Sequence, residues 1–190
     1  MPAAWRKALD WLGTIVLAIV FVLVFEAEIA KPYRIPSSSM EPTLHCAKPG
    51  AWCEAGFNDR ILVNRLAYDF GSPERGQIVV FKAPPATAKC GPDDSGSTFV
   101  KRLIGLPGDV VSERSGIVFV NGKRLDDSYV DPSLRDHESG TWRVPAGRYF
   151  FLGDDRIHSC DSRVWGSVPR KNLIGPVLLT YWPPSRISLH

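Results

Sequence analysis

The hydrophobic residues of this chain form one long run near the N-terminus and only short stretches after it. Residues 11–25 read WLGTIVLAIVFVLVF and carry no charge, and Arg6 and Lys7 stand shortly before them. As a helix this run extends only about 22 Å, whereas a helix continued to Ala30 extends about 30 Å, which matches the hydrocarbon core of a bilayer. The pattern therefore predicts one transmembrane helix over residues 11–30.

A secretory signal peptide is the competing interpretation, because a basic start and an apolar stretch of about 7–15 residues also describe such a peptide. Its cleavage site requires small residues at the first and third positions upstream. Cleavage after Ala30 would put Glu28 at the third position, and cleavage after Ala27 would put Phe25 there. The sequence therefore favours an uncleaved anchor over a removed signal.

The charges beside the run predict its orientation. Positively charged flanks of a transmembrane helix stay in the cytoplasm, so Arg6 and Lys7 predict that residues 1–10 are a short cytoplasmic N-terminus. Residues 31–190 are then an extracytoplasmic domain, attached to the cell membrane by a single pass. The lipid bilayer is accordingly one expected partner.

Beyond the run, the apolar stretches are short and bounded by Gly, Pro, Asn and Asp, a pattern typical of β-strands. The expected strands cover residues 60–66, 77–82, 117–120, 148–152 and 177–182. Asn121-Gly122 separates two apolar-bearing stretches and predicts a β-hairpin. Polar segments at residues 83–97 and 126–140 predict surface loops. We therefore expect a mainly β domain behind the N-terminal helix.

Composition and charge narrow the choice only slightly. The 190 residues include 44% hydrophobic residues and carry a formal net charge of +3, which fits one folded domain and no disordered class. Domains that bind nucleic acid usually have a basic patch and a pI above about 9, whereas the pI here is near 8.7. The sequence therefore indicates no nucleic-acid partner, and it does not predict an oligomeric state.

Four cysteines lie in the expected extracytoplasmic domain, where disulfides form and persist. Neither a C-x-x-C nor an H-E-x-x-H spacing is present, so no metal site is predicted. Four cysteines allow three pairings, of which we favour Cys46 with Cys53 and Cys90 with Cys160. Free buried thiols are the alternative.

Three motifs suggest the chemistry. They are residues 35–44 (IPSSSMEPTL), 101–109 (KRLIGLPGD) and 153–163 (GDDRIHSCDSR). No G-x-S-x-G elbow occurs, and none of the three consecutive serines has lysine three positions later, so two common serine-hydrolase patterns are absent. In this order behind an N-terminal apolar run, the motifs resemble the type I signal peptidases, membrane-bound Ser-Lys endopeptidases that remove signal peptides. The resemblance extends from the run to about Pro176.

The resemblance implies a role for each of several residues. Ser39 is then the nucleophile and Lys101 the general base. Ser37 donates its hydroxyl to the oxyanion, and the hydroxyl of Ser159 orients the lysine amine. It further implies a mainly antiparallel β-sheet fold, cleavage of exported preproteins after small-x-small sites, and no metal or organic cofactor.

Lysine chemistry adds a physical requirement. An amine accepts a proton only when it is neutral. A free lysine has a pKa of about 10.4, so half-neutral lysine at pH 7 requires a penalty of about 4.6 kcal/mol on the charged form, which only burial supplies. A carboxylate near Lys101 would raise its pKa, and the resemblance accordingly implies that Asp161 pairs with Arg163 beneath the site.

Departures from the family pattern and two rival functions complete the prediction. Asp155 stands where asparagine is common, Cys160 follows Ser159 directly, and residues 45–59 form a segment that is usually shorter. One rival is a Ser-Lys peptidase dedicated to a single substrate, as in pilin processing or organelle import. The other is an inactive membrane-anchored β domain that binds exported proteins, against which the retention of Ser39 and Lys101 argues.

Overall fold

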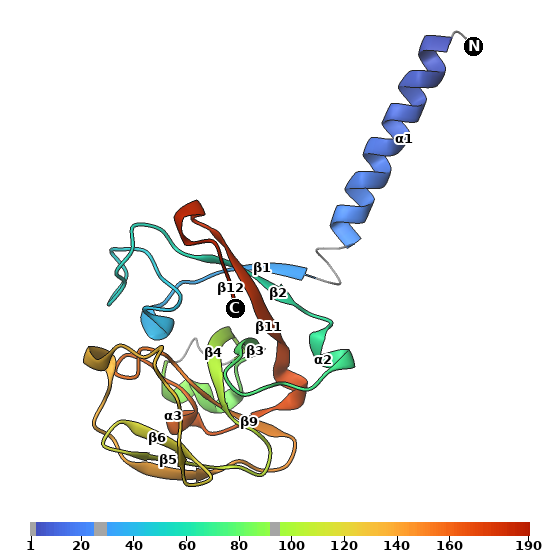
Figure 1. Ribbon diagram of the computed structural model, residues 1–190. Helices are drawn as coiled ribbons and strands as arrows, with labels where there is room; N and C mark the ends of the chain where they lie inside the picture. Colours follow the sequence, from blue (N-terminus) through green and yellow to red (C-terminus); the bar gives the residue numbers. More distant parts are fainter. Residues whose placement is uncertain (1–2, 25–29, 92–95) are drawn as a thin grey trace.

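A computed structural model describes residues 3–24, 30–91 and 96–190. Helix α1 (Ala3–Val24) stands apart from a β domain that holds the remaining elements (Figure 1). The side chains of residues 10–22 are exposed, large apolar ones included. The apolar run is therefore helical, as predicted, from residue 11 to residue 24, and its side chains at residues 11–22 lie outside the domain core.

The predicted transmembrane helix over residues 11–30 requires correction. The helix begins at Ala3 and ends at Val24, while Ala30 begins strand β1, where it pairs with Asn64 and is 2% exposed. Residues 25–29 lie outside the described residues. Across residues 3–24, 30–91 and 96–190, no helix combines the length and the apolar character that crossing a bilayer requires. The backbone of Ala30 bonds to the sheet and cannot also extend the helix.

The β domain is built around a strongly curved antiparallel sheet, and the prediction of a mainly β, antiparallel domain is confirmed. Its strands follow the spatial order β1 (Ala30–Arg34), β2 (Arg60–Asn64), β11 (Leu173–Trp182), β3 (Ile78–Lys82), β4 (Thr98–Gly105), β9 (Arg148–Leu152) and β10 (Val168–Pro169), with β12 (Ser188–Leu189) paired to β11. Neighbouring strands in this order pair antiparallel. Each predicted strand in this region coincides with an observed one to within a few residues.

A smaller antiparallel sheet lies at the end of the domain farther from α1 in Figure 1. Its strands follow the order β7 (Lys123–Arg124), β6 (Ile117–Val120), β5 (Val110–Arg114) and β8 (Gly140–Arg143). Between β6 and β7, Asn121 has φ 52° and Gly122 has φ 78°. Two consecutive left-handed residues are what a two-residue hairpin turn requires, so the predicted Asn-Gly hairpin is confirmed.

Helical segments within the β domain are short. They are α2 (Ala67–Phe70), α3 (Ser162–Trp165), η2 (Ser38–Met40), η3 (Pro85–Lys89), η4 (Pro132–Leu134), η5 (Arg170–Asn172) and η6 (Pro184–Arg186). Of the two predicted loops, residues 83–97 contain η3 and residues 126–140 contain η4.

Apolar packing fixes the positions of η2 and β4, the two segments that carry the serine and the lysine motifs. The turn η2 is held because Met40 packs into one core cluster with Ile35 and Leu44. Strand β4 is held because Leu103 packs into a second cluster, which includes Phe81 and aromatic side chains of β9 and α3. Serine and lysine motifs are thus carried by segments that are anchored in the core.

Candidate active site

Ser39 lies at the centre of the short turn η2, directly after the edge strand β1. The backbone N–H of Glu41 donates to the carbonyl of Ser38 at 2.8 Å and closes the turn. The neighbouring Met40 is 1% exposed and seats the turn in the core, whereas Ser39 is 9% exposed and lines a cavity. The apolar residues of the first motif therefore fix the backbone from which the serine is presented.

Lys101 lies in the middle of β4 and is 4% exposed. Alternation along the strand places it on the same face as Phe99 and Leu103, and its amine lies 6.0 Å from the centre of the Phe99 ring. Burial lowers the pKa of Lys101 to about 8, against the charge of Asp161, which raises it. At a pKa of 8, about one amine in ten is neutral at pH 7.

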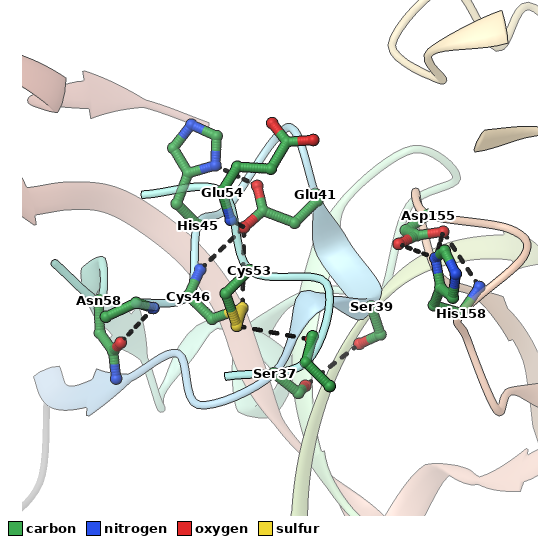
Figure 2. The surroundings of a disulfide bond; sticks show 12 residues. Ser37, Ser39, Glu41, His45, Cys46, Cys53, Glu54, Asn58, Asp155 and His158 are labelled. Atoms are coloured by element: carbon green, nitrogen blue, oxygen red, sulfur yellow. Dashed lines mark hydrogen bonds and ion pairs between the residues drawn. A yellow bond between two sulfur atoms is a disulfide. The ribbon is translucent and has the colours of Figure 1, made fainter. Parts of the chain in front are cut away.

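A single cavity of about 480 Å³ brings the serine and the lysine together, since Ser37, Ser39 and Lys101 all line it. Figure 2 shows Ser37 and Ser39 facing one another, with their hydroxyl oxygens 3.5 Å apart. Residues from the end of β1 and from β4 line the cavity, Arg34 and Val100 among them, and so does Ile35, which follows β1. Apolar and polar side chains thus both face this cavity.

Ser159 lies close to Ser39, because both residues lie against Gly153. A β-carbon placed on Gly153 would overlap both the hydroxyl of Ser159 and the carbonyl oxygen of Ser39. The Ser159 hydroxyl is buried, and no hydrogen-bond partner for it occurs in the part of the chain that the structure describes. Its predicted role of orienting the amine of Lys101 stays a prediction.

Asp161 and Arg163 form the ion pair that the third motif implies. The guanidinium donates to both carboxylate oxygens, at 2.9 Å each. Asp161 also accepts the N–H of Gly153 at 3.1 Å and that of Arg163 at 3.2 Å, which caps α3. Arg163 further contacts Asp136 and lies 3.6 Å from Glu113, whose pKa burial raises to about 7.

One buried carboxylate joins the three motifs, a link that sequence reasoning did not anticipate. Asp154 is fully buried and accepts two hydrogen bonds from Arg102, at 2.9 Å and 2.6 Å. It also accepts the hydroxyl of Thr43 at 2.6 Å. Because Thr43, Arg102 and Asp154 come from different motifs, this contact holds the serine turn, the lysine strand and the third motif in one arrangement. Bidentate pairing of this kind has strict geometry.

The four cysteines form two disulfides, Cys46 to Cys53 and Cys90 to Cys160, with Cα–Cα distances of 5.0 Å and 6.0 Å. These are the pairs that the sequence analysis favours. Cys160 lines the same cavity as Ser39 and Lys101, so the second bridge ties the loop after β3 to the residue that follows Ser159.

His158 is a further cavity residue that sequence reasoning missed. Its Nδ1 lies 2.8 Å from the buried carboxylate of Asp155, and its ring stacks on Trp52 with 4.1 Å between ring centres. His158 lines the same cavity as Ser39. The spacing of Asp155 and His158 within the third motif was a usable signal for their pairing, but the stacked Trp52 comes from a distant loop.

A second cluster, away from the serine, has side chains of the kinds that ligate metals. Donor atoms of Glu41, His45 and Glu54 lie within 4.8 Å of one another. The buried carboxylate of Glu41 accepts the N–H of Cys46 at 3.0 Å and contacts the ring of His45 (Figure 2). These contacts with the protein account for the burial of Glu41, and we assign no metal to the cluster.

Comparison with known proteins gives consistent results. The family described as signal peptidase, peptidase S26, matches residues 8–182. Signal peptidase I of Leptolyngbya laminosa is 37% identical over 98% of this chain and 86% of its own length. Signal peptidase I of Mycobacterium tuberculosis is 36% identical over 97% of this chain and 76% of its own. Thylakoidal processing peptidase 1 of Arabidopsis thaliana is 36% identical over 90% of this chain and 47% of its own.

Proposed function

The chain belongs to the signal peptidase family, peptidase S26, and on this premise we propose that it is a serine endopeptidase with Ser39 as nucleophile and Lys101 as general base. It is a hydrolase of the signal peptidase I type, and it cleaves N-terminal signal peptides from exported preproteins. The observation that carries the dyad is the shared cavity, which is lined both by Ser39 and by the buried Lys101 of lowered pKa.

The dyad acts in two stages. The neutral amine of Lys101 takes the proton of Ser39 while the serine oxygen bonds to the scissile carbonyl carbon. The Ser37 hydroxyl and the backbone N–H of Ser39 donate to the resulting oxyanion. The lysine then gives its proton to the departing amine as the C–N bond breaks, which leaves an acyl group on Ser39. Water, deprotonated by Lys101, hydrolyses that ester.

The substrate enters as an extended strand between the cavity walls. Among the described strands, β1 pairs with β2 alone, and β9 pairs with β4 only from Arg102 onward. The unpaired backbone edges of β1 and of the first half of β4 can therefore hydrogen-bond to an added strand. Apolar walls that include Ile35 and Val100 leave room for small side chains, consistent with small-x-small cleavage sites.

Membrane attachment of the enzyme is supported by α1 and by the disulfides. Trp11, Leu17 and Phe21 are 71%, 71% and 67% exposed, and apolar side chains so exposed to water favour a lipid surface. The two disulfides favour the oxidising, extracytoplasmic side of the cell membrane. We infer that α1 holds the catalytic cavity near membrane-borne substrates.

Cleavage of a preprotein by the full chain in lipid vesicles tests the proposal. Wild type should release the mature protein, and the Ser39→Ala and Lys101→Ala variants should not. A chelator should leave the rate unchanged, because no step uses a metal. Activity that survives in the lysine variant would overturn the dyad. A panel of unrelated preproteins separates a general peptidase from one dedicated to a single substrate.

A further inference from the structure

A second cavity, of about 470 Å³, adjoins the catalytic one. His158 lines both cavities, so its ring forms a partition between them. On the far side of this partition the walls are built from the disulfide loop of Cys46 and Cys53, from Leu134 and from Asp155. Figure 2 shows this loop and the Asp155–His158 pair on either side of Ser39.

The partition is held in place by several independent contacts. Asp155 is 1% exposed, and its carboxylate holds both the ring and the backbone N–H of His158. One face of the imidazole is covered by Trp52, in a stack with an angle of 17° between the ring planes. The disulfide closes the loop on which Trp52 lies. The second cavity therefore has a rigid aromatic wall.

The side chain of Trp52 is available for contact with a molecule outside the domain. It is 67% exposed despite its size, and exposed Trp side chains are typical centres of binding energy. Its φ of 63° is a left-handed conformation that tryptophan rarely adopts. A strained backbone that presents an exposed ring is a feature of functional sites.

We propose that this second cavity binds the part of the polypeptide that follows the scissile bond. The proposal rests on the proposed function. Residues before the bond occupy the walls made by β1 and β4, which lead up to Ser39 and Lys101. His158 lines this cavity as well as the second one, so a chain that continues from one to the other passes over the Trp52–His158 stack. The flat rings pack against its backbone and against an apolar side chain, and Leu134 extends that apolar wall.

Two synthetic substrates with the same residues before the cleavage site test this proposal. One carries two residues after the site, and the other carries eight. Wild type should cleave the longer substrate with the higher kcat/KM. Trp52→Gly, which suits the left-handed backbone but removes the ring, should lose about tenfold on the longer substrate and nothing on the shorter one. Trp52→Phe should recover most of the loss.

Phe57→Ala provides the matched control, because Phe57 is 64% exposed near the same loop but lines neither cavity. It should behave as wild type on both substrates. An equal loss on both substrates in Trp52→Gly, or no loss on either, would overturn the second cavity as a substrate site. Failure of wild type to cleave either substrate would instead contradict the proposed function.

Discussion

Gly153 lies against the backbone of Ser39 with no space for a side chain between them. The contact is reinforced on one side by the N–H of Asp155, which donates to the Ser39 carbonyl at 3.3 Å. On the other side, the N–H of Gly153 donates to Asp161. The third motif therefore positions the nucleophile through backbone contacts, in addition to any role of its side chains.

Replacement of Gly153 by alanine should abolish most of the activity. The added methyl group would displace the Ser39 carbonyl or the Ser159 side chain, and a displacement of about 1 Å can cost about a hundredfold in rate. Preprotein cleavage measures the loss of activity, and circular dichroism on the same sample shows whether the variant is folded. Gly56→Ala is the control, because a β-carbon there meets nothing within 4 Å. Near-wild-type cleavage by Gly153→Ala would contradict the close fit.

The rate of cleavage should rise with pH through a midpoint of about 8. Burial lowers the pKa of Lys101 to that value, and only the neutral amine is a base, so activity increases as the proton is lost and is level above the midpoint. The measurement is kcat/KM between pH 5 and 10, on a peptide without ionisable groups beside the scissile bond. A rate that does not change between pH 7 and 9 would contradict Lys101 as the base.

Changes in the buried ion pair should move this midpoint in opposite directions. The positive charge of Arg163 lowers the pKa of Lys101, and the negative charge of Asp161 raises it. Arg163→Gln should therefore move the midpoint of the pH profile to higher pH, and Asp161→Asn should move it to lower pH. Since the two side chains are 6% and 0% exposed, each single variant should also lose about 3–5 kcal/mol of stability.

The double variant serves as the control for that pair. Loss of both charges should return the midpoint toward the wild-type value, because the two electrostatic effects on Lys101 oppose one another. Thermal unfolding at a fixed pH separates lost stability from an altered profile. Single variants that shift the profile in the same direction would contradict an electrostatic effect on the lysine.

Reduction of the Cys90–Cys160 bridge should lower activity. Cys160 lines the catalytic cavity and follows Ser159, so release of the bridge lets this segment move away from Lys101. The Cys90→Ser/Cys160→Ser variant, which keeps the Cys46–Cys53 bridge, should lose activity without reductant and lose about 2–5 kcal/mol of stability. Cleavage assays with and without dithiothreitol give the comparison. A wild-type rate that is indifferent to reductant would contradict this effect.

Local pattern was sufficient for those parts of the fold that depend on neighbouring residues. Short apolar stretches bounded by turn residues predicted β2, β3, β6, β9 and β11, and Asn121-Gly122 predicted its hairpin because two left-handed residues are a local requirement. The end of the first helix was different. Ala30 leaves the helical pattern since it pairs with Asn64, a partner that no local window contains.

The candidate site divides in the same way. Ser39 and Lys101 were identified from motifs in the sequence, and the structure brings both to one cavity. The stack of Trp52 on His158 and the contacts of Asp154 with Thr43 and Arg102 were not predicted. Each depends on contacts between segments that are far apart in the sequence, and the local pattern of apolar and polar residues does not specify such contacts.

The carboxylate of Asp154 makes the complete site depend on three segments at once. It engages Thr43 and Arg102 only when the serine turn, the lysine strand and the third motif have all docked. With Lys101 as the proposed base, a partly folded chain in which these segments are not docked has a solvated, protonated lysine and should not cleave. Proteolysis is then expected only from copies that have completed the fold.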